Sequence, residues 1–560
     1  MTRLRLRSVL ATGALALALA LGFQVGGAFS SSDDTEQARK VAEAFRIISE
    51  AYVEDVDSAH LAESAIEGML ADLDPHSIYI SADEMRAVRE SFNATFDGIG
   101  IYYEWVEGEA EQDTLVVLMP IAGGPSEEAG LEAGDRIVQI DDTLALGFDT
   151  NLVQQYLKGP RGTEVDLVVK RPGFREPLSF TITRDRIPLE TVVATYMLDD
   201  ETGYIKLQRF ARTSHREVVA AIRDLRQQGM ERLILDLRDN AGGLLDQAYA
   251  ISDEFLSAGQ MVVYTDSRHP QNRNEYLSTS GGSYEDDPLI VLINESSASA
   301  SEIVAGAVQD HDRGLLVGRR SFGKGLVQQQ FPLTDGSVLQ MTVSRYFTPV
   351  GRLIQTPYEV GGEDEDYFAA KSELSEAIRE RVGAGGLIDA DALADVFPDS
   401  LQFRTDGGRT VYGGGGIFPD YIVSIDTLSQ AAQVVLGRGL DNLFARDFVA
   451  ANPGLRDEWT GREAAFTRGF ELPEGTYEDF VAFVEAQGIP VLDEPPADGE
   501  EGVSRTQLDA ERFTLETRLR AFIARRTFGI DSFFPVVGQI DETLVQANRL
   551  WGTAARLAAR

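Results

Sequence analysis

The sequence predicts a multidomain protein with an α/β core, helices before the core and a helical region after it. A chain of 560 residues is too long for one hydrophobic core, which favours two to four domains. Residues 187–360 alternate apolar strand-like runs with helical segments, an order typical of α/β folds. Apolar residues recur at helical spacing within residues 35–72, and the pattern is helical again from residue 428.

Composition excludes several functional classes. The net charge is -39, from 51 basic and 90 acidic residues, which argues against a nucleic-acid binder. Such a charge suits a soluble acidic protein and a halophilic one equally well. Without cysteine the chain has no disulfide, thiolate metal site or cysteine nucleophile. Its five histidines form no HExxH pair, so we expect neither a metal nor another cofactor.

The first residues are typical of a targeting segment. Residues 1–29 contain three early arginines, an apolar stretch over 9–23, and small residues at Gly26 and Ala28. A cleaved export signal fits this pattern, and an uncleaved membrane anchor fits it too, because residues 9–29 are long enough to cross a bilayer. Either alternative places the rest of the chain outside the cytoplasm, in the periplasm or a similar compartment, with anchoring to the inner membrane in the second.

Two regions precede the core. The N-terminal helical region, residues 35–92, has an apolar face that packs either on the core or on a second subunit, and we expect a homodimer through these helices. That face contains Val41, Phe45, Ile48 and Tyr52. Residues 93–186 have short strand-like runs between glycine-rich turns, with a short helix that ends at Gly130.

The core is expected over residues 187–427. Its predicted strands are 203–207, 233–237, 289–293 and 315–318, with a helix over 215–229. An insertion over 361–410 separates these elements from a last strand that follows a glycine run at 413–416. The helical C-terminal region, 428–560, contains a stretch at 490–504 that is rich in proline, glycine and acidic residues and is interpreted as a linker.

A serine-rich segment follows the predicted strand at 289–293. Residues 294–303 lead from that strand into a helix, where a serine on a tight turn can act as a nucleophile beside free N–H groups. The alternative is an ordinary serine helix cap supported by Glu302.

Two glycine-containing segments could complete such a site. Lys324 lies between two glycines, and a buried lysine can serve as a general base, with Gln328 to orient its amine. The alternative is an exposed turn lysine; a phosphate loop does not fit, because glycine follows the lysine. Residues 235–244 run from a buried strand into Gly242 and Gly243, whose bare backbone could approach a substrate carbonyl or simply form a turn.

A fourth segment could bind a peptide terminus. Gly98, Ile99 and Gly100 precede a strand, and such a loop can direct N–H groups at a terminal carboxylate while the peptide adds to the strand. By itself this pattern has little specificity.

Together and in this order, these segments resemble the C-terminal processing peptidases, or tail-specific proteases. The matching motifs are Leu-Asp-Pro-His-Ser-x-Tyr from Leu73, Phe-x-Gly-Ile-Gly, Asp-Leu-Arg-x-Asn-x-Gly-Gly, Ser-Ala-Ser-Ala-Ser-Glu-Ile, and Phe-Gly-Lys-Gly followed by glutamine. The resemblance covers about residues 40–360 and the segment 413–420. It implies a crotonase- or ClpP-like α/β protease core with an inserted PDZ domain at 93–186.

The resemblance also implies roles for individual residues. Ser299, twenty-five residues before Lys324, would be the nucleophile, although Ser297 and Ser301 flank it and make a register error conceivable. Lys324 would be the base and Gln328 would hold its amine. The remaining implied groups are the oxyanion N–H groups of Gly242, Gly243 and Ala300 and the loop for the substrate's C-terminus at Gly98, Ile99 and Gly100.

The expected function is therefore a serine endopeptidase with a Ser/Lys dyad that cleaves exported polypeptides with apolar C-termini. His76, in the family turn, is interpreted as structural. Two alternatives are a non-catalytic PDZ scaffold on a protease-like core and an acyl-handling enzyme of the crotonase type. An adaptor or regulator protein is a further conceivable partner, and nucleic acid is not.

Overall fold

The computed structural model describes residues 32–558 apart from 108–112, 122, 172, 360–371, 373, 379, 382–384, 388–392, 394, 424–427 and 497–500. The predicted export signal or anchor at 1–29 lies outside the described residues. Within them, no helix joins enough length to enough apolar character to cross a membrane. The chain divides into two compact units, residues 1–80 and residues 81–560.

The first unit contains the N-terminal helices that the sequence predicts. They are α2 (Ser32–Ala51) and α3 (Ser58–Leu70), followed by the short strand β1 (Ile78–Ile80). The expected apolar face is largely uncovered: Val41 and Ile48 of α2 are 49% and 44% exposed, and Tyr52, directly after the helix, is 61% exposed. This unit therefore carries an apolar surface that nothing described within it buries.

The second unit begins with α4 (Ala82–Asn93) and an inserted β-rich part. Its sheet has the order β3–β4–β5–β7–β8, with β6 paired to β5, so that β3 is an edge strand. The strands are β3 (Ile101–Glu107), β4 (Asp113–Pro120), β5 (Arg136–Ile140), β6 (Thr143–Leu144), β7 (Glu164–Lys170) and β8 (Leu178–Thr183). Two helices accompany them, α5 (Pro125–Ala129) and α6 (Thr150–Leu157), and α5 ends at Gly130 as predicted.

The inserted part is joined to the core through one antiparallel strand pair. The chain enters it through β2 (Thr95–Gly98) and leaves through β9 (Asp185–Pro188), and these two strands pair with each other. Both connections therefore run side by side in a two-stranded stem.

The core is built on a seven-stranded sheet with the order β10–β11–β12–β15–β16–β22–β19. The five inner strands are parallel, and β10 and β19 are antiparallel edge strands. The strands are β10 (Val192–Met197), β11 (Thr202–Leu207), β12 (Arg232–Asp236), β15 (Leu289–Ile293), β16 (Leu315–Gly318), β19 (Gly385–Leu387) and β22 (Tyr421–Val423). The strands predicted at 203–207, 233–237, 289–293 and 315–318 are confirmed.

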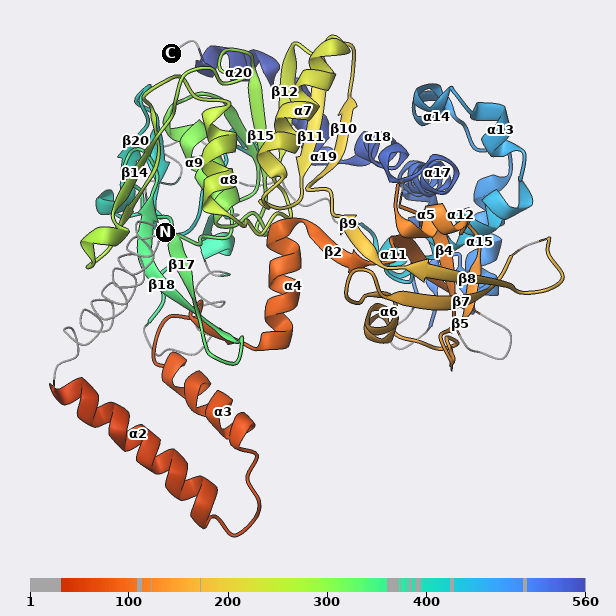
Figure 1. Cartoon of the computed structure of the whole chain (residues 1–560). Helices are drawn as coiled ribbons and strands as arrows, with labels where there is room; N and C mark the ends of the chain where they lie inside the picture. The colour runs from red at the N-terminus through yellow and green to blue at the C-terminus, as the bar shows by residue number, and fades with distance from the viewer. Residues whose placement is uncertain are drawn as a thin grey trace, which may run out of the picture. The chain divides into compact units, whose positions relative to one another are not determined.

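Both faces of this sheet are covered by helices. One face packs against α7 (Ser214–Gln227), α8 (Leu245–Asp253) and α9 (Ala300–Asp310), which lie beside the strands in Figure 1. The other face packs against α19 (Glu542–Arg549) and α20 (Trp551–Ala558) at the end of the chain. On β12, Leu233 and Leu235 face the first layer and Ile234 the second. Burial on both faces explains why these strands are continuously apolar in the sequence.

A second sheet supports the core. It contains β17 (Leu326–Pro332), β18 (Val338–Phe347), β13 (Met261–Asp266) and β14 (Asn274–Leu277), with β18 between β17 and β13. The pairing of β17 with β18 has a bulge between Val327 and Gln328. The short strands β20 (Gln402–Arg404) and β21 (Thr410–Tyr412) form a separate hairpin.

The predicted insertion is integrated with the core. Its described residues include β19, which pairs with β22 at the edge of the main sheet, and Ile378, Leu393 and Phe397 share a small apolar cluster with Phe418. The segment 361–410 thus contributes a strand to the sheet that it interrupts in sequence.

The C-terminal region is helical, as predicted, and forms its own apolar clusters. Its helices are α11 (Gln430–Gly437), α12 (Leu440–Ala451), α13 (Leu455–Trp459), α14 (Glu463–Gly469), α15 (Thr476–Ala486), α16 (Arg505–Ala510), α17 (Arg512–Phe528) and α18 (Phe534–Val537). The ends of the stretch interpreted as a linker are packed instead. There β23 (Val491–Leu492) pairs with β24 (Val503–Ser504), and Val503 is 2% exposed because it packs among these helices.

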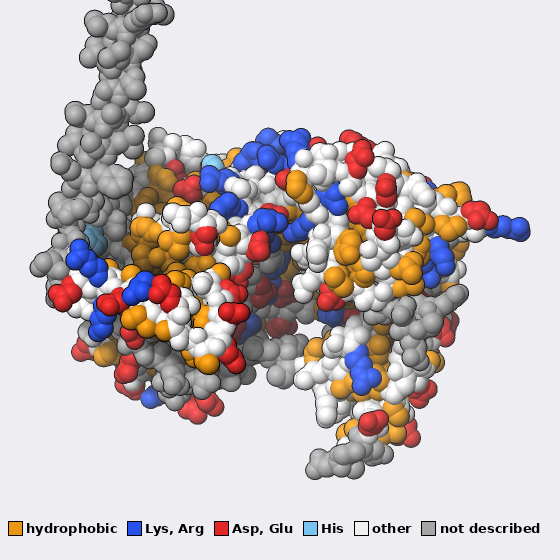
Figure 2. Space-filling model, turned by 60° about the horizontal axis from the view of Figure 1, so that its bottom comes forward, with side chains coloured by type: hydrophobic (Ala, Val, Ile, Leu, Met, Phe, Trp, Pro, Cys, Tyr) orange, Lys and Arg blue, Asp and Glu red, His pale blue; other side chains and the backbone are white. Residues whose placement is uncertain are grey.

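Acidic side chains are scattered over the face of the protein that Figure 2 shows. In the face shown in Figure 2 they lie among apolar and basic groups rather than in one continuous patch. This distribution agrees with the net charge of -39.

The last helices are expected to stabilise the core. Leu544 of α19 is 2% exposed in the apolar cluster under the main sheet. Leu544→Ala should lower the free energy of unfolding by about 2–5 kcal/mol, measured by urea denaturation with tryptophan fluorescence. Phe513→Ala, at a position that is 65% exposed on α17, is the control and should change it by less than about 0.5 kcal/mol. Equal effects of the two substitutions would contradict this account.

Candidate active site

Ser299 lies at the junction between β15 and α9 and has an unusual backbone conformation. Its φ is 53° and its ψ is -109°, and a positive φ is uncommon for a residue with a side chain. The flanking serines are wholly buried, and their hydroxyls donate to backbone carbonyls: Ser297 to Leu237 and Ser301 to Asn240, both at 2.8 Å. Ser299 is partly exposed. These differences distinguish Ser299 from the two serines that made its register uncertain.

The carboxylate of Glu302 connects two separate backbone segments. Its Oε2 accepts hydrogen bonds from the backbone N–H groups of Ser299 (2.8 Å) and Lys324 (2.9 Å). Its Oε1 accepts from the Ser321 hydroxyl (2.6 Å) and the Gly323 N–H (2.7 Å). All four partners are donors, which suits an ionised carboxylate, an acceptor only. Burial nevertheless raises the pKa of Glu302 above its usual value, against the effect of these hydrogen bonds.

Tyr346 of β18 joins the same two segments on their carbonyl side. Its hydroxyl oxygen lies 2.6 Å from the Lys324 carbonyl oxygen and 3.1 Å from that of Ser299. Its side chain is buried, and burial raises the pKa of Tyr346, so the phenol keeps the proton that it donates. Ser299 and Lys324, far apart in the sequence, are thus brought together through a shared carboxylate and a shared phenol.

The predicted supporting glutamine lies on the neighbouring strand. Lys324 is partly buried just before β17, and Gln328 follows at the bulge in that strand. The Oε1 of Gln328 accepts a hydrogen bond from Gln340 at 3.4 Å.

Of the predicted glycine pair, Gly242 lies directly against Ser299 and Gly243 against Phe210. Gly242 has a φ of 97°, and a Cβ there would stand 2.9 Å from both the Ala300 nitrogen and the Ser299 Cβ, so only glycine fits. The N–H of Gly242 donates to the Asn240 side chain at 2.9 Å. Gly243 packs as closely against the backbone of Phe210, whose oxygen would stand 2.1 Å from an added Cβ.

A buried ionic network supports the start of this glycine loop. Arg238 binds Asp236 and also donates two hydrogen bonds, of 2.9 and 2.6 Å, to Asp541 in the C-terminal region. Burial opposes ionisation of Asp236, but the charges of Arg238 and Lys206 outweigh it and hold its pKa below the usual range. The tail of the chain therefore helps to hold the segment that leads to Gly242.

The residues expected to bind a peptide terminus lie apart from this group, at the start of β3. Gly98 ends β2, Ile99 is 2% exposed, and Gly100 has a φ of 75°. The Ile99 carbonyl accepts hydrogen bonds from the N–H and the hydroxyl of Ser126, at 3.0 and 2.7 Å. The loop is thus fixed immediately before an edge strand to which an extended chain can add.

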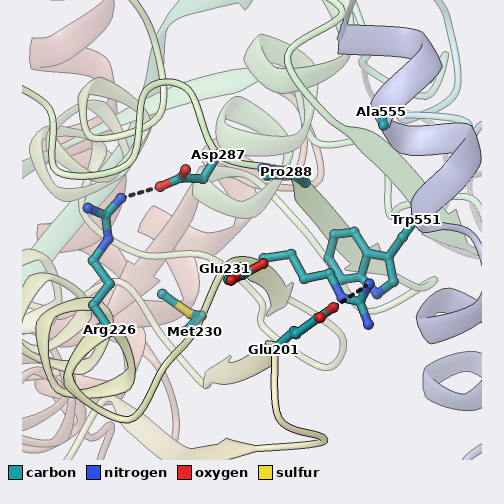
Figure 3. A pocket seen from close by; sticks show the side chains of 9 residues that line it. Glu201, Arg226, Met230, Glu231, Asp287, Pro288, Trp551 and Ala555 are labelled. Carbon is teal, nitrogen blue, oxygen red and sulfur yellow. Dashed lines mark hydrogen bonds and ion pairs between the residues drawn. The ribbon is translucent and has the colours of Figure 1, made fainter.

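A separate cavity of about 640 Å³ lies at the N-terminal ends of the parallel strands, away from Ser299 (Figure 3). Its walls include Glu201, Arg232 and Pro288, which lie at the N-terminal ends of β11, β12 and β15, whereas Ser299 follows the C-terminal end of β15. Arg226 forms an ion pair with Asp287 there, and the Arg232 guanidinium carbon lies 5.2 Å from the centre of the Trp551 ring. Among the described residues, no group of three or more His, Asp or Glu side chains could hold a metal ion.

Sequence reasoning missed two connecting residues and undervalued a third. Glu302 was noted only as a helix-capping residue, although it also binds the lysine segment. Ser321 and Tyr346 carried no local signal, because their partners are 19 and 47 residues away. The two glycines that flank Lys324, Gly323 and Gly325, were the local indication that its segment needed a close backbone approach.

Comparisons with known proteins agree with this organisation. Residues 201–362 match Peptidase family S41, residues 116–171 match the PDZ domain, and residues 24–84 match the N-terminal domain of the activating protease CtpB. The chain is 38% identical over 324 residues to a carboxy-terminal-processing protease of Bartonella bacilliformis, covering 57% of this chain and 73% of that protein. It is 34% identical to a carboxyl-terminal-processing protease of Synechocystis, covering 60% of this chain and 83% of that protein. It is also 34% identical to the carboxy-terminal processing protease CtpB of Bacillus subtilis, covering 59% and 69%.

The contacts of Glu302 generate a prediction about stability. In Glu302→Gln, an amide NH2 replaces one accepting oxygen and faces two hydrogen-bond donors, so the free energy of unfolding should fall by about 1–3 kcal/mol in urea denaturation. The matched control is Glu295→Gln in the same loop, where Glu295 pairs with Arg319 and is 44% exposed. Glu295→Gln should lower the free energy of unfolding by less than about 1 kcal/mol. A Glu302→Gln protein as stable as the control would show that the four bonds do not hold the site.

Proposed function

Because the chain belongs to the carboxy-terminal processing proteases of peptidase family S41 and is a serine peptidase with a PDZ domain, we propose that it cleaves exported polypeptides with a Ser299–Lys324 dyad. It recognises the C-terminal ends of these substrates through the PDZ domain. The observation that carries this proposal is the double connection of Ser299 to Lys324 through Glu302 and Tyr346. A segment at 1–29 with the features of an export signal or anchor supports action outside the cytoplasm.

The proposed reaction has two steps. The neutral amine of Lys324 takes the proton of the Ser299 hydroxyl as Oγ attacks the scissile carbonyl carbon. Collapse of the tetrahedral intermediate breaks the C–N bond, and Lys324 returns the proton to the leaving amine. Water, activated by the Lys324 amine, then hydrolyses the acyl-enzyme. In this proposal Lys324, which is partly buried, reacts as the neutral amine, and Gln328 orients that amine.

The oxyanion would be stabilised by backbone N–H groups around Ser299. Ala300 begins α9, whose N-terminus carries partial positive charge, and Gly242 approaches its nitrogen closely. The Gly242 N–H is bonded to Asn240, so it can serve only if substrate binding redirects it. Ala300 is therefore the first donor in this proposal, with Gly242, and less directly Gly243, completing the site.

Peptide binding at the PDZ domain is proposed to act on the active site rather than only tether the substrate. The carbonyl of Phe92, just before the stem, accepts a hydrogen bond from the Arg212 N–H at 3.0 Å, and the Asn93 side chain accepts from the guanidinium at 2.9 Å. Two residues earlier, the Phe210 N–H donates to the Gly242 carbonyl. This short route from the stem to the glycine loop supports activation by the bound peptide.

The catalytic assignment is tested with purified residues 31–560 and an unfolded protein with an apolar C-terminus. Ser299→Ala and Lys324→Ala should each abolish cleavage, with a loss of at least about 1,000-fold in gel-based degradation, because each removes one half of the dyad. Ser296→Ala, an exposed neighbour in the same loop, should retain parent activity. Full activity of Ser299→Ala would refute the nucleophile assignment, and an inactive parent would favour the scaffold alternative or a requirement for a regulator.

We also propose that the N-terminal helices form a homodimer, because the exposed residues on α2 make one apolar stripe. Ile48→Lys should raise the dimer dissociation constant at least about tenfold in analytical ultracentrifugation, since it buries a charge in the contact. Glu43→Lys, on the opposite side of the same helix, is the control and should leave the dissociation constant unchanged. A monomeric parent, or equal effects of the two changes, would exclude this interface.

A further inference from the structure

The C-terminal region is attached to the edge strand of the PDZ domain. Arg526 of α17 donates two hydrogen bonds, of 2.8 and 2.7 Å, to the two carboxylate oxygens of Glu104 on β3. Its Nη2 also donates to the Asn442 side chain at 3.0 Å. The Arg526 and Glu104 side chains are only 10% and 16% exposed, so this is a largely desolvated, two-point contact. Just beyond α17, Gly529 approaches the side chain of Met119 on β4.

The contact is on the outer face of β3. Along this strand Ile101, Tyr103 and Trp105 pack into the PDZ core. Tyr102 and Glu104 alternate with them and therefore point to the opposite face. A peptide that pairs with β3 alternates in the same way, so every second side chain of that peptide is directed to the face that α17 approaches.

A cavity of about 150 Å³ lies between this face and the C-terminal region. Its lining includes Tyr102, Met119, Arg525 and Ile530. Unlike its neighbour Arg526, Arg525 has no ion pair with any described residue. Burial is the main cause that lowers the pKa of Arg525, and the positive charge of Arg526 is the second. Glu104 and Tyr102 act in the opposite direction but only partly offset this decrease. A partly desolvated cation therefore lines a cavity beside the edge strand, in a protein whose net charge is -39.

We infer that Arg525 forms an anion subsite of the PDZ domain, which binds the carboxylate of an Asp or Glu side chain near the C-terminus of a substrate. The inference rests on the proposed peptide recognition at β3. When the terminal side chain points to the core side of β3, the penultimate and fourth-from-last side chains are on the side of Arg525. The substrate class is thus a polypeptide with an apolar last residue and an acidic residue at one of these two positions.

The chemistry of the lining fits a carboxylate. The planar guanidinium group presents paired N–H donors that match two carboxylate oxygens. Burial raises the pKa of Tyr102, so its phenol stays protonated and can donate a further hydrogen bond. Both carboxylate oxygens of Glu104 already accept hydrogen bonds from Arg526, which limits their competition with a substrate carboxylate for Arg525.

The test measures binding of fluorescent ten-residue peptides to residues 31–560 by anisotropy, with peptide integrity checked by mass spectrometry. The peptides share an apolar last residue and carry Asp or Asn at the penultimate or the fourth-from-last position. The parent should bind the better Asp peptide about tenfold more tightly than its Asn counterpart, and the ratio should shrink at high salt. Arg525→Gln should bind both with the parent's affinity for the Asn peptide. Arg512→Gln, at an exposed ion pair on the same helix, should keep the parent's preference.

The outcomes separate this inference from the proposed function. Equal binding of Asp and Asn peptides by the parent, or an unchanged preference in Arg525→Gln, would overturn the anion subsite while leaving PDZ recognition intact. If no peptide binds to the parent, the Asn peptides included, recognition through β3 itself fails and the subsite falls with it. Loss of all peptide binding in Arg525→Gln alone would make Arg525 a structural support of the PDZ domain and would equally overturn the inference.

Discussion

The arrangement around Ser299 depends on one buried carboxylate. Glu302 takes part in the first turn of α9, yet its two oxygens also accept hydrogen bonds from the Ser321 hydroxyl and from the backbone N–H groups of Gly323 and Lys324. A single side chain thereby sets the position of the strand–helix junction relative to the lysine segment. A carboxylate only accepts hydrogen bonds, so it can bind four converging donors. A neutral side chain of the same size carries a donor of its own and cannot. Tyr346 repeats the connection from the second sheet, which explains why the site requires both sheets of the core.

Sequence patterns predicted the elements of this fold better than the contacts between them. The strands around residues 233–237 and 289–293 could be identified because burial on both faces makes them continuously apolar. Ser299 and Lys324 could be named through the family motifs, and the close packing of Gly242 agrees with the expected role of glycine there. Tyr346, Asp541 and Arg526 could not be predicted. Each is an ordinary residue in its own segment and acquires a partner only through the tertiary fold, up to 422 residues away in sequence.

The C-terminal region has more connections than its lack of motifs suggested. Through α19 and α20 it covers one face of the main sheet, and through Asp541 it binds Arg238 beside the glycine loop. Through α17 it holds the edge strand of the PDZ domain. One helical region therefore contacts both the PDZ domain and the core that contains the proposed dyad. Ordinary helix packing describes α19 and α20 but does not account for the charged contacts of Asp541 and Arg526.

The coverage of the main sheet by α19 and α20 has a consequence for biosynthesis. A polypeptide is made from its N-terminus onward, so residues 542–558 emerge after the strands that they cover. Until then, the apolar side chains that these helices cover, Ile234, Ile290 and Leu292 among them, have no helical layer over them. An incomplete chain would already contain the serine and the lysine but not a finished core around them. The order of translation thus delays completion of the core around these two residues until α19 and α20 have been made.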